Sequence, residues 1–289
     1  MIPTPRVLES VTRVTPLAVR FWDEVTRATI SDGLRVVAYA KNQPDRLLRP
    51  IENRHRTFVW SDLPGLRDQE YGAGDQDYWA APPPKRTFTI EVQDDAARFL
   101  PFSFEVAVPV RDVITWQCIT AAGPFTHPAG TLPLFSSPAR PVPAALAAIR
   151  LEVHSDQFDA QLKAYPPAAW AMIEAHQGAN FITRTLTDEQ GRAILAFPYP
   201  DLPAGDLGHP FVEHTWPINL RAYYHPTTPK AAAPNLCAAL SQGVTKLWST
   251  LLPATELTQV TLPFGQPAAI PGLPPAKPSD TLLVWVTPV

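Results

Sequence analysis

The stretch Phe102-Ser-Phe-Glu-Val-Ala-Val-Pro109 decides the fold class, because large apolar residues alternate with small or polar ones along it. The runs Phe88-Thr-Ile-Glu-Val92 and Val260-Thr-Leu-Pro-Phe264 repeat this period of two. Such alternation is typical of strands that bury one face. Proline accounts for 35 of the 289 residues and often brackets the apolar runs. Since proline is confined to strand ends, edges and bulges, the sequence predicts an all-β protein built from many short strands.

An ordered series of apolar runs occurs twice along the chain. The first three runs recur at an offset of roughly 130–136 residues, far longer than solenoid repeats of about 20–50 residues. A chain of 289 residues is also long enough for two domains, each with its own core. The first series comprises residues 17–23, 33–39, 57–64 and 98–109, and the second comprises residues 147–153, 168–175, 192–200 and 215–224.

We therefore expect two tandem β-sandwiches, over residues 1–132 and 147–289, joined by a Pro-rich linker over 133–146. One helix, over residues 235–252, is expected as an insertion in the second sandwich. Its apolar residues have helical spacing, Asn235 is a suitable N-cap, and Pro253 would stop it.

Residues 258–289 contain two further strand-like runs, Thr258–Phe264 and Thr281–Thr287. They have no counterpart in the first series of runs. They either complete the second sandwich or add a strand to a neighbouring subunit.

Charge is scarce in the second half of the chain. Asp, Glu, Lys and Arg number 32 in residues 1–140 and 19 in residues 141–289. Because the centres of protein interfaces are depleted of charge, we interpret this half as covered by partner subunits. The alternative is a compact domain with a surface rich in Thr, Pro and Ala. The excess of 18 Arg over 6 Lys also fits an interface, but GC-rich codon usage gives the same bias.

No nucleic acid or membrane partner is expected. The net charge is −3, so no overall basic field is present to hold nucleic acid. The basic run from Arg46 to Arg56 is interleaved with acidic residues and is interpreted as a solvated or salt-bridged loop. No run of 18 apolar residues indicates a membrane span, and residues 1–6 lack the apolar run of a signal peptide. Cytoplasmic synthesis is therefore expected.

Cysteine chemistry is not expected either, because Cys118 and Cys237 form neither a disulfide framework nor a zinc pattern. The segment His209-Pro-Phe-Val-Glu213-His214 has one residue too many for an inverted zinc motif, and its proline opposes a helix. Asp75 and Asp77 lack the further oxygen ligands that calcium requires.

Enzyme activity is not expected. The acidic pairs Asp94–Asp95 and Asp188–Glu189 lie between strand-like runs and are interpreted as turns. No nucleophile elbow, phosphate-binding glycine loop or Cys/His pair occurs. We predict no catalytic, cofactor-binding or metal-binding residues, no cofactor and no small-molecule ligand.

Eight tryptophans are the remaining candidates for binding. Trp79 precedes a proline-rich loop and Trp285 lies near the C-terminus, so either could be exposed and could stack on a sugar or anchor an interface. Five further tryptophans fall inside strand-like runs and are expected in the core: Trp22, Trp60, Trp116, Trp170 and Trp216.

Two stretches resemble the transthyretin-like sandwich called the carboxypeptidase regulatory-like domain. Thr187-Asp-Glu-Gln-Gly191, followed by the apolar run 192–198, is similar to the family's Thr-Asp-x-x-Gly turn and strand. Phe58-Val-Trp-Ser-Asp-Leu-Pro-Gly65 is similar to its strand and Leu-Pro-x-Gly turn, although Arg54-His-Arg56 replaces the preceding turn glycine. The resemblance implies a fold and no activity.

A broader resemblance covers most of the chain. The series Arg20–Asp23, Asp62–Arg67, Arg98–Pro101, Phe197–Pro200 and Thr215–Pro217 resembles proteins encoded beside phage-tail-like contractile injection systems. It implies a non-enzymatic structural subunit of a tail, baseplate or cap, whose partners are other protein subunits of the particle. The second hypothesis is a β-sandwich module that binds glycan or peptide through Trp79 or Trp285.

Overall fold

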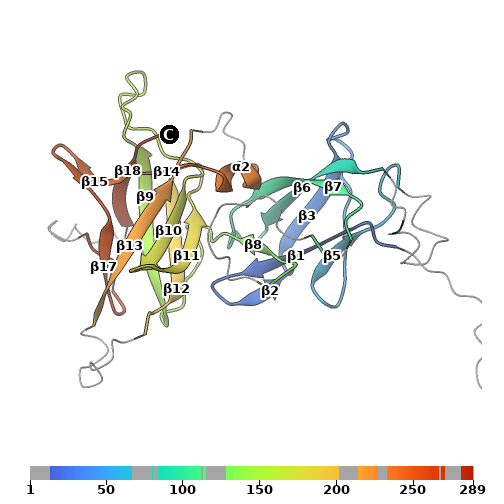
Figure 1. Cartoon of the computed structure of the whole chain (residues 1–289), viewed down its shortest axis with the longest axis horizontal. Coiled ribbons are helices and arrows are strands. Elements are labelled where there is room, and N and C mark those ends of the chain that lie inside the picture. The colour runs from blue at the N-terminus through green and yellow to red at the C-terminus, as the bar shows by residue number, and fades with distance from the viewer. Residues whose placement is uncertain are drawn as a thin grey trace, which may run out of the picture.

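The computed structural model describes residues 14–66, 80, 84–111, 113–114, 128–201, 214–226, 233–266, 268–270 and 281–288. Strands dominate these residues and helix is almost absent, which confirms the all-β fold class. The strands form four sheets (Figure 1). The sheets fall into two sets, one from β1–β8 and one from β9–β18, here called the first and second halves.

The first half contains two sheets around one core. One has the order β2-β1-β5-β4, with β8 parallel to β1, and the other has the order β3-β6-β7. Buried side chains of both sheets belong to a single apolar cluster. The bounds are β1 Leu17–Asp23, β2 Ala28–Ile30, β3 Leu34–Ala40, β4 Ile51–Glu52, β5 Thr57–Trp60, β6 Arg86–Asp94, β7 Phe102–Val108 and β8 Leu132–Leu134.

The second half contains two five-stranded sheets around a second cluster. One is β11-β10-β13-β14, with β17 also paired to β13, and the other is β12-β9-β18-β15-β16. The bounds are β9 Leu146–Ser155, β10 Met172–Gln177, β11 Asn180–Leu186, β12 Arg192–Pro198, β13 Thr215–Tyr223, β14 Val244–Thr245, β15 Leu247–Leu251, β16 Ala254–Glu256, β17 Gln259–Pro263 and β18 Thr281–Val286.

The two halves repeat one pairing scheme. In the first, β1 pairs antiparallel with β5 and parallel with β8, while β6 pairs antiparallel with β3 and β7. In the second, β9 pairs antiparallel with β12 and parallel with β18, while β13 pairs antiparallel with β10 and β17.

This scheme corrects the sequence-based alignment in two respects. The counterpart of β13 is β6 rather than residues 98–109, and the strands of 258–289 do have counterparts, β7 and β8. Both runs also pair within the chain. The sequence missed this because pairing is set by side chains of both strands and by register, which a single apolar run does not reveal.

The helix predicted over 235–252 is much shorter than expected. α2 spans Leu236–Leu240, with the predicted N-cap Asn235 accepting a hydrogen bond from the Ala238 amide. Beyond Gly243, β14 and β15 replace the rest of the helix. In β15, Leu247 and Ser249 are buried on alternate positions, so period two prevails over helical spacing. Cys237 of α2 is disulfide-bonded, contrary to the isolated thiol expected, and Cys118 lies outside the described residues.

The two halves pack against each other, and the segment that joins them is partly buried. In the expected linker 133–146, Leu134 ends β8, and Phe135 and Arg140 are buried. Trp170 and Met172 of the second half, together with α2, belong to the apolar cluster of the first. α2 lies between the halves in Figure 1, and the Ser103 amide donates to the Pro234 carbonyl (2.9 Å).

Candidate binding surfaces

A projecting loop connects β9 to β10 at the top of the second half (Figure 1). Its base is closed by the hydrogen bond from the Ser155 amide to the Pro166 carbonyl (2.8 Å). Its tip is held by Asp159, whose carboxylate accepts from the Gln161 and Leu162 amides (2.7 and 3.1 Å). These bonds give the backbone of the loop a defined conformation.

Large apolar side chains are exposed on this loop. Phe158 is 57% exposed and Leu162 is 63% exposed. The Phe158 ring meets Tyr165 edge-on (5.4 Å between centroids), and Tyr165 meets Trp285 of β18 in the same way (6.5 Å). The aromatic row therefore continues from the loop onto the sheet.

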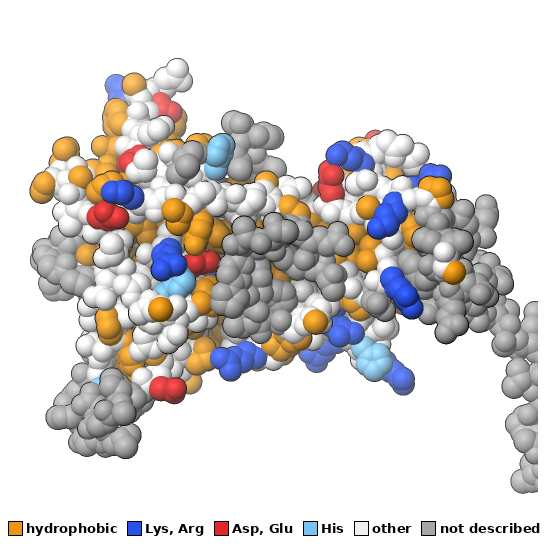
Figure 2. Space-filling view, viewed as in Figure 1, with side chains coloured by type: hydrophobic (Ala, Val, Ile, Leu, Met, Phe, Trp, Pro, Cys, Tyr) orange, Lys and Arg blue, Asp and Glu red, His pale blue; other side chains and the backbone are white. Residues whose placement is uncertain are grey.

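β18 extends this surface because its side chains alternate between core and solvent. Val284 and Val286 are fully buried, whereas Leu283 is 45% exposed and Trp285 is half-buried. Figure 2 shows hydrophobic side chains gathered along this part of the second half. We call Phe158, Leu162, Tyr165, Leu283 and Trp285 the outer apolar face. A surface that fixes aromatic and aliphatic side chains in solvent is typical of a protein interface.

The histidine beside the outer apolar face is already hydrogen-bonded. His154 lies next to Trp285 in the sheet. Its Nδ1 lies 2.9 Å from the Tyr165 carbonyl and its Nε2 lies 3.0 Å from Glu152. Both ring nitrogens are thus engaged, and this histidine orients the projecting loop rather than offering a free base.

A buried polar network lies on the face of β10, β11 and β13 opposite to their core. Glu174 is its centre: it contacts His176 Nε2 (3.1 Å), the Tyr223 hydroxyl (3.1 Å) and the Arg184 guanidinium (3.5 Å). Burial, followed by the negative charge of Glu174, raises the pKa of Tyr223. Glu174, His176 and Arg184 are buried, and Tyr223 is half-buried.

A β-bulge places an aromatic ring in this network. The register of β10 against β11 shifts between Ala175 and His176, so that Phe181 pairs with His176. The extra residue puts Phe181 and Arg184 on one face, although three positions separate them. The guanidinium lies over the Phe181 ring (4.8 Å), and the His176 ring meets it edge-on (5.7 Å). Phe181 thereby connects the network to the cleft beside it.

The cleft is a cavity of about 590 Å³ between the first and second halves. The first half contributes Trp22 of β1 and the turn residues Glu24 and Arg27. From the second half come the β10–β11 hairpin, with Gln177, Asn180 and Phe181, and the segment after β12, with Tyr199 and Asp201. The Tyr199 ring is held against Trp216 and Phe264 (5.2 and 4.8 Å between centroids). Rigid aromatic walls with several polar side chains are typical of a ligand site.

Glu24 differs from the other carboxylates near the cleft. Burial raises its pKa, and the positive field of Arg184 only partly opposes this effect. Its neighbour Asp23 behaves oppositely: burial favours its neutral form, but hydrogen bonds from Arg140 and Thr26 outweigh burial and lower its pKa. The pKa values of these adjacent carboxyl groups thus shift in opposite directions, because Asp23 is paired with Arg140 whereas Glu24 faces the cavity.

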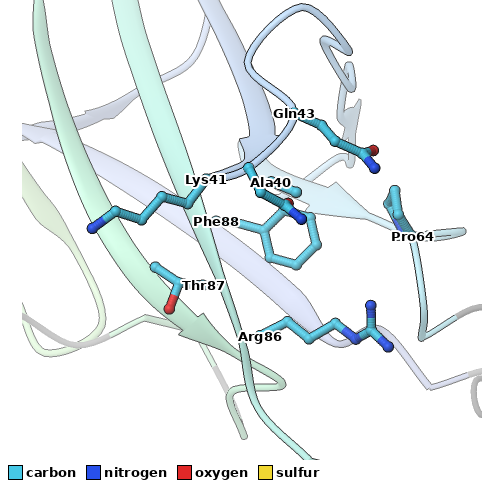
Figure 3. Close-up of a pocket in the computed structure, with 8 residues that line it drawn as sticks. Ala40, Lys41, Gln43, Pro64, Arg86, Thr87 and Phe88 are labelled. Atoms are coloured by element: carbon cyan, nitrogen blue, oxygen red, sulfur yellow. The ribbon is translucent and has the colours of Figure 1, made fainter.

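A second pocket, of about 430 Å³, lies at the edge of β3 and β6 in the first half (Figure 3). Figure 3 shows the Lys41 ammonium and the Arg86 guanidinium pointing away from each other across Phe88. Lys41 is paired with Glu105 (3.0 Å), and Arg86 packs over Gly65. The two cations do not converge, so this pocket forms no anion site.

The remaining sequence candidates fall into two groups. The acidic pairs are turns, as expected: Asp94 accepts from the Arg98 amide (2.6 Å) and Asp188 from the Arg192 amide (2.8 Å). The basic run 46–56 is exposed at its Arg and His residues. Outside the described residues lie Trp79, Trp116, Asp75, Asp77, His209 and Glu213.

Trp22 corrects one expectation, since it lines the cleft, whereas Trp60, Trp170 and Trp216 are buried as predicted. The period of two could have indicated this, because Trp22 stands one position out of phase with the buried Phe21 and Asp23.

Within the described part of the chain, no cluster of three His, Cys, Asp or Glu side chains is placed to bind a metal. No described helix has the length and apolarity needed to cross a bilayer.

Comparison of the chain with protein-family models, curated proteins and solved structures finds no match.

Proposed function

We propose that the chain is a non-enzymatic structural subunit of a phage-tail-like contractile injection particle, synthesised in the cytoplasm and acting through protein–protein contacts. The observation that carries the proposal is the outer apolar face. It combines Phe158, Leu162 and Tyr165, on a loop closed by hydrogen bonds, with Leu283 and Trp285 of the adjacent strand β18. A neighbouring protein subunit is its proposed occupant.

The composition of the second half supports this assignment. Five of the seven large apolar side chains that are most exposed among the described residues belong to it: Phe158, Leu162, Val244, Leu252 and Leu283. The same half is poor in charge. Exposed apolar residues on a surface with little charge limit solubility unless a partner covers them. The particle itself is proposed from the sequence resemblance to proteins of contractile injection systems.

The proposal includes the architecture of the chain as two tandem immunoglobulin/transthyretin-like sandwiches. Its support is that each half has an apolar cluster between two sheets, the first of which also takes in side chains of the second half, and that the halves repeat one pairing scheme. The second sandwich, with its projecting loop, would then be the half that contacts neighbouring subunits.

Replacing Phe158 and Leu162 together by serine is expected to remove the chain from assembled particles. Burial of an aromatic or aliphatic side chain contributes roughly 1.5–3 kcal/mol, so loss of both weakens the contact by about 100-fold or more. The measurement is co-sedimentation of the tagged chain with particles purified from cells that express its neighbouring genes, checked by electron microscopy.

Leu47→Ser is the matched control, because Leu47 is also 57% exposed but lies in the first half. We expect it to co-sediment like the wild type. If the wild-type chain stays a soluble monomer that never enters a particle containing sheath and tube proteins, the proposed function is wrong.

A further inference from the structure

We propose that the cleft between the halves is a binding site for a neutral carbohydrate, with Trp22 and Phe181 as stacking surfaces and Glu24, Asn180 and Asp201 as hydrogen-bonding groups. The site uses neither Trp79 nor Trp285, and it does not depend on the role of the outer apolar face. It therefore goes beyond the proposed structural function.

The polar side chains of the cleft are free to bind a ligand. In the described residues, Glu24 and Asp201 make no hydrogen bond or ion pair, and neither do Arg27, Gln177 and Asn180 through their side chains. This contrasts with the neighbouring carboxyl groups of Asp23 and Glu174, each held by several partners. A partly buried carboxyl without a donor is costly, so a ligand that donates to Glu24 is favoured.

The set of free groups matches the chemistry of a sugar. Carboxyls accept hydrogen bonds, Arg27 donates, and the amides of Gln177 and Asn180 do both. Each hydroxyl of a sugar also both donates and accepts, while the C–H faces of its ring are apolar. Aromatic rings from two different elements, Trp22 of β1 and Phe181 of β11, line the same cavity. A polyhydroxylated ring satisfies both kinds of surface at once.

The position of these groups favours a sugar over an extended peptide. A peptide that adds to a sheet is held by main-chain hydrogen bonds along one strand edge. Here the polar groups come from strand ends: Glu24 and Arg27 lie in the β1–β2 turn, Gln177 and Asn180 at the β10–β11 turn, and Asp201 after β12. They surround a compact volume instead of following an edge.

The charge of the lining selects neutral sugars. Two carboxyls, Glu24 and Asp201, stand against one cation, Arg27. This balance disfavours sulfated, phosphorylated or uronic-acid glycans, whose negative charge would meet uncompensated carboxylates. The cavity volume of about 590 Å³ lies within the usual range of roughly 300–1,000 Å³ for small-ligand sites.

The test is an array of neutral and acidic oligosaccharides probed with the full-length chain, followed by calorimetry with cellohexaose, chitohexaose and maltohexaose. We expect at least one neutral oligosaccharide to bind. Asn180→Ala should weaken that binding about tenfold, because it removes one hydrogen bond to the sugar. Glu24→Gln should weaken it by a similar factor, because it replaces a carboxyl group by an amide, which is a weaker acceptor. Trp22→Ala should weaken it further through lost stacking.

Trp285→Ala is the control, since Trp285 lies on the outer apolar face and outside the cleft. Circular dichroism of each variant verifies folding, and Glu24→Gln keeps the size of the side chain if Trp22→Ala unfolds the protein. Absence of any neutral oligosaccharide binding would overturn the proposal. So would binding that survives Glu24→Gln and Asn180→Ala but is lost in Trp285→Ala, or preferential binding of an arrayed peptide library that these cleft variants abolish.

Discussion

Replacing Gly191 by alanine is expected to lower the free energy of unfolding by roughly 2–6 kcal/mol, the sum of backbone strain and overpacking. Gly191 ends the Thr187–Gly191 turn with a φ of 75°, a conformation that costs little only for glycine. A Cβ at this position would also overlap the Val153 carbonyl oxygen and press on the Ala168 amide nitrogen. Backbone atoms of a buried strand cannot move aside as a flexible side chain can.

The surroundings of Gly191 explain why strain there affects the whole half. Its carbonyl accepts from the Val153 amide (2.8 Å), and its amide donates to the Asp188 carbonyl (3.0 Å). The Thr187 hydroxyl donates to the Ala168 carbonyl (2.6 Å). The turn thus fixes β9, the start of β12 and the segment before β10 together.

Gly178→Ala provides the matched control for this prediction. Gly178 also has a positive φ, of 60°, but no atom lies near its added Cβ. Gly178→Ala should therefore lower the free energy of unfolding only through backbone strain, by about 1–2 kcal/mol. Urea unfolding followed by circular dichroism measures both variants. Equal losses of stability in the two variants would contradict the role assigned to the contact with Val153.

The second large effect is expected at the buried ion pair of Asp23 and Arg140. The guanidinium donates two hydrogen bonds to the carboxylate, of 2.9 and 2.6 Å, and lies over the Phe99 ring (4.9 Å). Arg140→Met keeps an unbranched side chain over Phe99 but leaves a buried carboxylate unpaired. We expect a loss of about 3–5 kcal/mol.

A double-mutant cycle separates the pair from its surroundings. Asp23→Asn combined with Arg140→Met should cost clearly less than the sum of the two single variants, because neither then leaves a buried charge without its partner. The exposed pair Lys41–Glu105 (3.0 Å) is the comparison, and Lys41→Met should change stability by no more than about 1 kcal/mol. Additive effects at Asp23 and Arg140 would show that the pair is not coupled.

The same pair predicts a pH dependence of defined sign. Burial alone would raise the pKa of Asp23, but the hydrogen bonds and charge of Arg140 lower it below the usual value of 3.8. The folded state therefore holds the proton less tightly than the unfolded state. The stability from ionised Asp23 is complete above the unfolded pKa and disappears as the pH falls through the lower folded pKa. The difference in unfolding free energy between wild type and Asp23→Asn should accordingly shrink as the pH falls from about 5 toward 2.

The sequence allowed the strands to be predicted wherever one face is buried and the other is not. Phe102, Phe104, Val106 and Val108 are buried in β7 as their alternation indicated. The prediction was wrong beyond Gly243. Apolar residues three or four positions apart over a short segment are compatible with a helix and equally with two short strands. Asn235 was still identified as an N-cap, since capping depends on local hydrogen bonds.

The cleft could not be predicted, because its residues come from segments far apart in the chain. Glu24, Asn180 and Asp201 share no motif, and only the packing of β1 against the second half brings them to one cavity. Trp285 was recognised as a candidate, but its edge-on contact with Tyr165 depends on the loop between β9 and β10. Such sites depend on contacts between segments that are far apart in the chain, and a single sequence carries little information about those contacts.

The parallel pairing of β18 with β9 has a consequence for synthesis on the ribosome. β9 begins at Leu146 and β18 at Thr281, so 135 residues of chain separate the starts of two adjacent strands. At about 5–20 residues per second, translation takes roughly 7–27 s to supply the missing neighbour. During that interval the nascent β9 has an unpaired edge, which another nascent chain on the same message could occupy. Slowing translation between β9 and β18 should therefore increase co-translational aggregation.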